Sequence, residues 1–151
     1  SVSLLGVGQP RAGGDTEKLL ARLELTDKVQ FVSGITTAEM VRFYAEATLA
    51  VVPSIYEGFG LPAAEAMACG VPVVSTDGGA LPEVVGDAGV MVPVRDAAAL
   101  AAAIESLLLN PQRRAELGEQ GRVRIDEKFC WRVTAGHMSD YYRQVLQHAN
   151  R

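Results

Sequence analysis

The stretch that decides the fold is Pro53-Ser-Ile-Tyr-Glu-Gly-Phe-Gly-Leu-Pro-Ala-Ala-Glu-Ala-Met-Ala-Cys-Gly70. The apolar run before it, residues 49–52, is typical of a buried strand in a parallel sheet. We expect a helix to begin near Leu61, because the proline that follows suits a first helical turn, where no amide donor is needed. Gly70 marks the end of this helix, and residues 71–74 open the next strand. The sequence therefore predicts a strand, a glycine loop, a helix and a second strand.

This arrangement has a chemical consequence. The N-terminus of a helix offers unpaired amides and a partial positive charge, which together attract phosphate. Gly58 and Gly60 lack side chains, so a ligand can approach the backbone there. Glu57 and Glu65 stand eight positions apart on either side of these amides. Because two carboxylates would repel a phosphate, we expect each to accept hydrogen bonds from neutral hydroxyls, as the ribose and the sugar of a nucleotide-sugar would provide.

Each of these residues also has a purely structural explanation. Glu65 could be an acid placed favourably against the helix dipole. Glu57 could be a solvated loop residue, and the glycines could serve the turn alone. The joint pattern is more specific than any of its members.

The motif Glu57-Gly-Phe-Gly-Leu-Pro-x-x-Glu65-Ala-Met-Ala-x-Gly-x-Pro-Val74 resembles the E-x7-E signature of retaining glycosyltransferases of family GT4, in their C-terminal domain. The resemblance implies that Glu57, the expected catalytic residue, contacts the hydroxyls of the donor sugar and does not act as a nucleophile. It implies that Glu65 holds the ribose hydroxyls. The backbone amides that would meet the sugar and diphosphate are those of Gly58, Phe59, Gly60 and Leu61.

Two further pairs of residues match the family. Gly34 and Ile35, after the expected strand at residues 29–32, would help shape the pocket for the base, although Ile35 could instead pack under the following helix. Thr76-Asp-Gly-Gly-Ala-Leu-Pro-Glu83 resembles the family's Gly-Gly-x-Pro-Glu stretch. It places Gly78 and Gly79 at the border of the sugar pocket, at the carboxyl end of a neighbouring strand, where open α/β sheets bind ligands.

The resemblance covers almost the whole chain and implies its architecture. Residues 1–151 would form a single Rossmann-like α/β domain with a parallel sheet flanked by helices, the C-terminal half of a GT-B fold. The chain starts without an initiator Met, so we expect a piece of a longer protein whose N-terminal acceptor domain is absent. Phe129-Cys-Trp131 resembles the family's Phe-Ser-Trp segment. A last helix at residues 129–148 would reach toward the missing domain, with Trp131 as a packing anchor.

Local signals predict the remaining elements. Asp15 or Thr16 is expected to cap a helix reaching about Glu24, and Thr36 or Thr37 one reaching about Ala45. A strand is expected at residues 89–94, a helix at 96–109 with Asp96 as its N-cap, and a helix at 111–128.

Composition limits the functional classes. Hydrophobic residues make up 48% and charged residues 21% of the chain, typical of a globular domain. A net charge of −4 argues against nucleic-acid binding, which needs a basic face. The only histidines, His137 and His148, lie far from any acidic cluster, so no metal site is expected. Cys69 and Cys130 are expected to be small buried hydrophobes in a reducing cytoplasm. No run has transmembrane length, and nothing resembles a signal peptide.

The implied activity is transfer of a hexosyl unit from a UDP-, GDP- or ADP-sugar to an acceptor held by the missing domain, without metal or cofactor. The parent would be cytoplasmic, with peripheral association at the inner membrane face left open. The isolated chain is predicted to be inactive. Two alternatives remain: a related GT-B 2-epimerase, against which the Phe59-Gly-Leu-Pro62 core between two glutamates argues, and a non-catalytic nucleotide-sugar-binding module. A dehydrogenase is disfavoured because Arg11 replaces the third glycine of a dinucleotide fingerprint.

Overall fold

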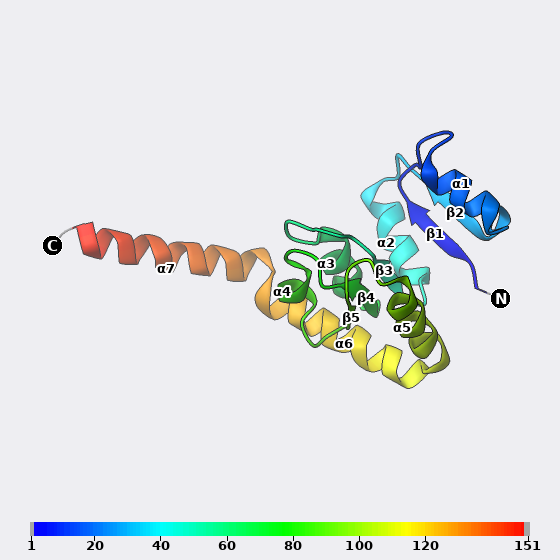
Figure 1. Cartoon of the computed structure of the whole chain (residues 1–151). Coiled ribbons are helices and arrows are strands. Elements are labelled where there is room, and N and C mark those ends of the chain that lie inside the picture. Colours follow the sequence, from blue (N-terminus) through cyan, green and yellow to red (C-terminus); the bar gives the residue numbers. More distant parts are fainter. Residues whose placement is uncertain (1, 150–151) are drawn as a thin grey trace. The chain divides into compact units, whose positions relative to one another are not determined.

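The computed structural model describes residues 2–149 and shows strands alternating with helices (Figure 1). The strands are β1 (Leu4–Val7), β2 (Val29–Val32), β3 (Ala50–Val52), β4 (Val73–Thr76) and β5 (Val90–Val92). The α-helices are α1 (Asp15–Arg22), α2 (Thr37–Glu46), α3 (Leu61–Ala68), α4 (Leu81–Val85), α5 (Ala97–Leu109), α6 (Pro111–Lys128) and α7 (Trp131–Ala149). A short 3-10 turn, η1 (Thr26–Lys28), precedes β2.

The chain divides into two compact units, one up to Met40 and one from Val41 onward. Each unit has its own parallel sheet. In the first, β1 pairs with β2, and Leu4 lies opposite Val29. In the second, β4 is the central strand between β3 and β5. The predicted α/β class with parallel strands flanked by helices is confirmed, and its strands are distributed over two sheets.

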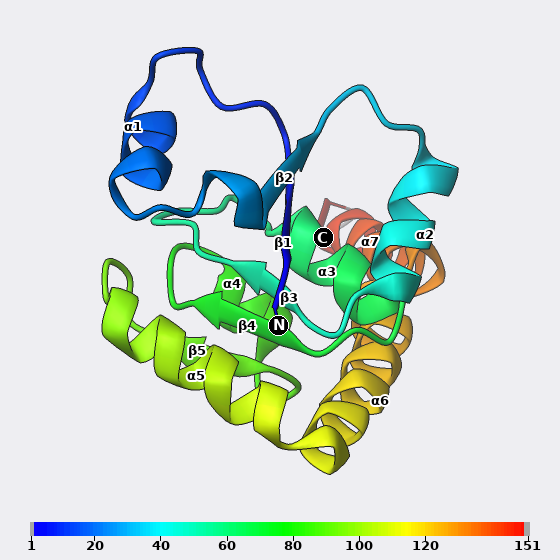
Figure 2. The ribbon, with the colours of Figure 1, turned by 90° about the vertical axis from the view of Figure 1, so that its right-hand side faces the viewer.

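The core of the second unit lies on both faces of β4, all four residues of which are buried. Because side chains alternate along a strand, Val73 and Val74 point to opposite faces. Val73 packs with side chains from α3 and α4, among them Met67, Leu81 and Val85. Val74 packs with Leu107 of α5 and with Leu117 of α6. Figure 2 shows α5 and α3 on opposite sides of this sheet. The central strand is therefore fixed by apolar packing on both sides.

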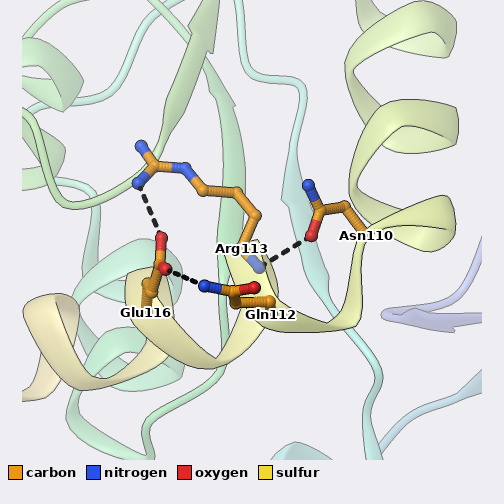
Figure 3. A network of polar contacts seen from close by, with 4 residues as sticks. All are labelled: Asn110, Gln112, Arg113 and Glu116. Carbon is orange, nitrogen blue, oxygen red and sulfur yellow. Dashed lines mark hydrogen bonds and ion pairs between the residues drawn. The ribbon is translucent and has the colours of Figure 1, made fainter.

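The junction between α5 and α6 follows its sequence signals closely. Asp96 caps α5 by accepting a hydrogen bond from the Ala99 amide at 2.9 Å. Asn110 ends α5 and caps α6, where its Oδ1 accepts from the Arg113 amide at 3.0 Å. Figure 3 shows this cap beside Glu116, which also accepts hydrogen bonds from the Gln112 and Arg113 side chains. The predicted Asp96 cap is confirmed, Asn110 acts as a further cap that was not predicted, and α6 has the expected bounds.

The first unit departs from its predicted caps. Gly14 is the N-cap of α1, so neither Asp15 nor Thr16 has that role, and the helix ends at Arg22 before Glu24. Glu17, inside the first turn, accepts from the Gly13 amide at 2.6 Å, one residue before this cap. Helix α2, in contrast, is capped by Thr36, one of the two predicted residues. Its hydroxyl accepts from the Glu39 amide at 3.3 Å, and its own amide donates to the Glu39 carboxylate at 2.8 Å, which is a capping box.

Helix α6 lies directly behind α3. A Cβ atom at Gly118 would overlap the Gly70 carbonyl oxygen, and one at Gly121 would lie 3.2 Å from Cγ of Met67. Farther along α6, the Arg124 side chain donates to the Val84 carbonyl at 2.8 Å, at the end of α4. Glycines therefore let the two helices approach closely, and an arginine ties α6 to α4.

Several large apolar side chains of α7 are exposed to solvent. Trp131 is 85% exposed, so it is not packed within the described residues, and its role as an anchor toward the missing domain stays a prediction. Other exposed side chains on this helix are Met138, Tyr141, Tyr142, Val145 and Leu146. Among residues 2–149, no helix combines the length and the apolar character needed to cross a membrane.

The two cysteines are also less buried than predicted. Cys69 is exposed because it follows the last turn of α3, whose inward positions are filled by Ala66 and Met67. Cys130 is half-buried at the start of α7, where a hydrogen bond from the Val133 backbone lowers the pKa of its thiol.

Candidate functional site

The first carboxylate of the motif lies in the β3–α3 loop, residues 53–60. Glu57 is half-buried there. Its Oε1 accepts a hydrogen bond from the Ser54 hydroxyl at 2.8 Å. The distance is that of a normal O–H···O hydrogen bond. One oxygen of Glu57 is thus already engaged within the loop.

The β4–α4 loop, residues 77–80, lies against the β3–α3 loop. A Cβ atom at Gly78 would come within 2.5 Å of the Ile55 carbonyl oxygen, and one at Gly79 would overlap the carbonyl oxygen of Glu57. The Ala80 amide donates to that same Glu57 oxygen at 2.9 Å. The glycine pair is required because the two backbones touch, and this contact fixes the backbone at Glu57.

Helix α3 begins immediately after this contact. Gly60 is its N-cap, with φ of 93°, a left-handed conformation that favours glycine. Among residues 2–149, none accepts a hydrogen bond from the four amides that lead into the helix, namely those of Gly58, Phe59, Gly60 and Leu61. Such amides, together with the helix dipole, form an environment suited to an anion.

The Phe59 ring links the β3–α3 loop to the start of α7. It packs edge-on against Phe129, with the ring centroids 5.8 Å apart and the planes at 75°. This is a favourable geometry for two aromatic rings. Phe59 remains 42% exposed, so the ring both braces the loop and presents a surface to solvent.

The second carboxylate, Glu65, is exposed on α3. Its Oε2 lies 3.4 Å from the hydroxyl of Tyr44 on α2, and the Pro62 carbonyl oxygen lies 3.3 Å from the same hydroxyl, so these two acceptors share its one proton. Burial raises the pKa of Tyr44 to about 12, and the negative charge of Glu65 adds to this effect. Tyr44 therefore stays protonated at neutral pH and acts as a hydrogen-bond donor toward Glu65.

Most of the residues singled out by the sequence lie in the second unit, on the two loops that follow β3 and β4 and on the start of α3. They are Glu57, Gly58, Phe59, Gly60, Leu61, Glu65, Gly78 and Gly79. Gly34 and Ile35 belong to the first unit. Gly34 has a left-handed φ of 67°, and a Cβ atom added there would meet nothing within 4 Å; Ile35 is half-buried.

Sequence reasoning missed two polar residues of this region. Ser54 stands three positions before Glu57, a hydroxyl–carboxylate spacing that could have suggested their hydrogen bond. Thr76, at the end of β4, donates its hydroxyl to the Ser54 carbonyl. No local signal joins residues 22 positions apart, so this second contact requires the sheet pairing. Among the described residues, no group of three or more His, Cys, Asp or Glu side chains could hold a metal ion.

Comparison with known proteins gives a consistent result. The family model described as glycosyl transferases group 1 matches residues 3–124. The chain is 40% identical over 148 residues to an MMP alpha-(1->4)-mannosyltransferase from Mycolicibacterium hassiacum, covering 96% of this chain and 36% of that protein. It is 37% identical to a D-inositol 3-phosphate glycosyltransferase 2 from Catenulispora acidiphila, covering 93% and 34%. The chain therefore spans about a third of the length of these relatives.

Solved structures agree on the fold. Sucrose-phosphate synthase from Thermosynechococcus elongatus superposes with a TM-score of 0.84 at 38% identity, over 97% of this chain and 39% of that one. A mutant of TarM from S. aureus, solved in complex with Fondaparinux, alpha-GlcNAc-glycerol and UDP, superposes with a TM-score of 0.79 at 25% identity, over 94% and 28%. The chain belongs to the glycosyl transferases group 1 family and has the fold of a GT-B C-terminal domain.

Proposed function

We propose that this chain is the donor-binding half of a retaining GT4 glycosyltransferase that transfers a hexosyl unit from a nucleotide-diphosphate sugar. One observation supports the proposal: Glu57 lies in the β3–α3 loop, which contacts the β4–α4 loop, and Glu65 lies on α3, which begins with unpaired amides, as far as residues 2–149 show. Carboxylates accept hydrogen bonds from hydroxyls, and amides at a helix start bind a diphosphate. A ligand that pairs with both carboxylates and with the amides therefore has hydroxyls on either side of a diphosphate.

Each group has a distinct task in this proposal. Glu57 accepts hydrogen bonds from hydroxyls of the donor sugar, and Glu65 accepts them from the ribose. The amides between Gly58 and Leu61 stabilise the negative charge that grows on the diphosphate as the sugar–oxygen bond breaks. Fixed dipoles stabilise such charge well because they need not reorient during the reaction. Gly78 and Gly79 border the sugar, and Gly34 and Ile35 contribute to the base pocket.

The ligand and partner classes follow from this assignment. TarM was solved with UDP, which supports a nucleoside diphosphate as the common part of the donor. UDP-, GDP- and ADP-sugars all remain candidates. The acceptor would bind to the rest of the parent protein, because this chain spans about a third of its relatives. We propose that donor binding needs no metal and that the protein acts in the cytoplasm. Chelation by EDTA should then leave donor affinity unchanged.

We further propose that the 151-residue chain binds donor and transfers nothing by itself. Acceptor groups would be needed for turnover, and in this proposal they lie elsewhere in the parent. Release of free sugar or labelled product by the purified chain, at a rate above that of buffer alone, would contradict this statement.

The deciding experiment is a calorimetric or NMR titration with UDP, GDP and ADP, each compared with its sugar conjugate. Glu65→Ala should abolish nucleotide binding, whereas Glu57→Ala should remove only the extra affinity contributed by the sugar. Glu105→Ala, an exposed acid on α5, is the matched control and should change neither. A folded chain that binds none of these ligands would overturn the proposed function.

A further inference from the structure

We propose that Ser54, anchored by Thr76, is the positioning residue for Glu57. The Ser54 hydroxyl donates a hydrogen bond to Oε1 of Glu57, so that Oε2 is directed toward the donor sugar. This inference rests on the proposed function and assigns a role to two residues that neither the motif nor the family resemblance singled out.

The first step is the contact between Ser54 and Glu57. The serine hydroxyl donates to Oε1 at 2.8 Å, and both side chains are half-buried. A carboxylate that accepts such a bond loses rotational freedom, because turning away would break the hydrogen bond. Among residues 2–149, none donates a hydrogen bond to Oε2. Oε2 of Glu57 is therefore left free, in a defined direction, for a hydroxyl of the ligand.

The second step is the anchor of Ser54 itself. Thr76 donates its hydroxyl to the Ser54 carbonyl, and Thr76 is only 4% exposed at the end of the central strand β4. At the other end of the same turn, the Ala80 amide holds the Glu57 carbonyl at 2.9 Å. One end of the Ser54–Glu57 turn is thus bonded to the last residue of β4, and the other end is bonded to the loop that follows β4. The turn that carries the Glu57 carboxylate is therefore held in place by its bonds to β4, whose four residues are all buried, and to the loop after it.

The third step separates positioning from simple stabilisation. Loss of the Ser54 hydroxyl frees the Glu57 carboxylate but leaves the amides of α3 and Glu65 in place. Binding of the nucleoside diphosphate should be unchanged. The sugar increment, which we define as the Kd of the nucleoside diphosphate divided by the Kd of its sugar conjugate, should fall about five- to tenfold, the usual net effect of one hydrogen bond. A residue that only stabilised the fold would weaken both ligands together.

The test measures the sugar increment of the 151-residue chain and its variants with UDP-glucose, GDP-mannose and ADP-glucose, using the conjugate that binds best. Ser54→Ala should lower the increment, and Ser54→Thr, which keeps the hydroxyl, should restore most of it. Thr76→Val, which removes the anchoring donor at nearly constant volume, should lower the increment as well. Ser106→Ala on an exposed face of α5 is the matched control and should have no effect.

The outcomes are distinguishable. If the wild type binds a nucleotide-sugar and Ser54→Ala keeps the full increment, the positioning role is overturned while the proposed function stands. Equal losses for nucleotide and conjugate would also overturn it, because they indicate a structural role. If Ser54→Ala does not fold, as judged by circular dichroism, Thr76→Val decides by the same ratio. If the folded wild type binds none of the conjugates, the proposed function and this inference both fail.

Discussion

The two carboxylates of the motif are held in very different ways. Glu57 is half-buried in a loop whose backbone touches a second loop, and one of its oxygens accepts a 2.8 Å hydrogen bond from Ser54. Glu65 is exposed on a helix, and its hydroxyl partner, Tyr44, lies 3.4 Å away at the limit of hydrogen bonding. The first is fixed by backbone contact, the second mainly by its place on α3.

This difference suggests a division of labour. A group that must align a sugar for bond breaking loses efficiency with small displacements, because catalysis depends on orientation. A group that only holds a ribose can adapt when the ligand arrives. We therefore expect substitutions near Glu57 to affect both the fold and the sugar, and substitutions near Glu65 to affect mainly the affinity for the nucleotide.

The largest effect should come from Gly79→Ala, which breaks the backbone contact at Glu57. The new Cβ would overlap the Glu57 carbonyl oxygen, and alanine would be forced into a φ of 63°. The clash and the left-handed strain should together cost about 3 kcal/mol of unfolding free energy, measurable by urea denaturation. Gly58→Ala is the matched control within the same site. It meets open space without a left-handed φ, so it should change stability little. Equal losses for both variants would break the comparison.

A smaller loss of stability is expected where α6 packs against the end of α3, the helix that carries Glu65. Gly118→Ala would press against the Gly70 carbonyl and push α6 away from α3, which we expect to cost about 2 kcal/mol. Gly136→Ala on α7 meets nothing within 4 Å and should be neutral or stabilising by up to about 1 kcal/mol, since alanine favours helices. Thermal denaturation of the two variants checks the sign. A stable Gly118→Ala protein would show that α3 needs no support from α6.

The contribution of Tyr44 to stability, measured as a function of pH, tests the environment of Glu65. The pKa of Tyr44 is raised from 10.0 to about 12, so the folded state retains the phenol proton more tightly than the unfolded state. Its contribution to stability is therefore complete below about pH 10 and is lost as the pH rises through about 12. Tyr44→Phe lacks this titration. Its stability should decline less than that of the wild type over this range, by about 1 kcal/mol after allowance for solvent screening. Parallel denaturation curves would indicate that Tyr44 is freely solvated.

The smallest effect should be that of Tyr44→Phe on ligand affinity at neutral pH. A 3.4 Å contact between a half-buried hydroxyl and an exposed carboxylate is weak, so nucleoside diphosphate affinity should fall only about two- to threefold. Calorimetry would measure this, with Tyr142→Phe on α7 as the control. A loss as large as that of Glu65→Ala would mean that Glu65 is held as firmly as Glu57, and the distinction between them would disappear.

Much of the fold could be predicted because its signals are local. Asp96, Asn110 and Pro111 act within a few residues of themselves, so the α5–α6 junction was predictable from the sequence. The motif residues were predictable for the same reason, since a strand, a glycine loop and a helix start are contiguous. At Gly14 the local signal misled, because the helix begins one residue earlier than expected, with a glycine as its N-cap.

The rest depends on contacts between distant segments. Thr76 reaches Ser54 only because β3 and β4 pair in parallel, and Gly118 meets Gly70 only because α6 packs behind α3. Apolar character alone did not predict the exposure of Trp131, because a residue on a helix is buried only if something packs on it. The division of the strands into two sheets is likewise a property of pairing, which composition does not encode.

The hydrogen bond from the Ala80 amide to Glu57 has a consequence for motion as well as for geometry. Breaking it requires the two loops to separate, and both are tied to β4, the strand packed on either face. We expect this amide to exchange its proton with solvent as slowly as the amides of the core, whereas those of Phe59 and Gly60 should exchange rapidly until an anion covers them. A single short loop would then contain some of the slowest and some of the fastest exchanging protons of the molecule, and the fast ones would report the arrival of the ligand.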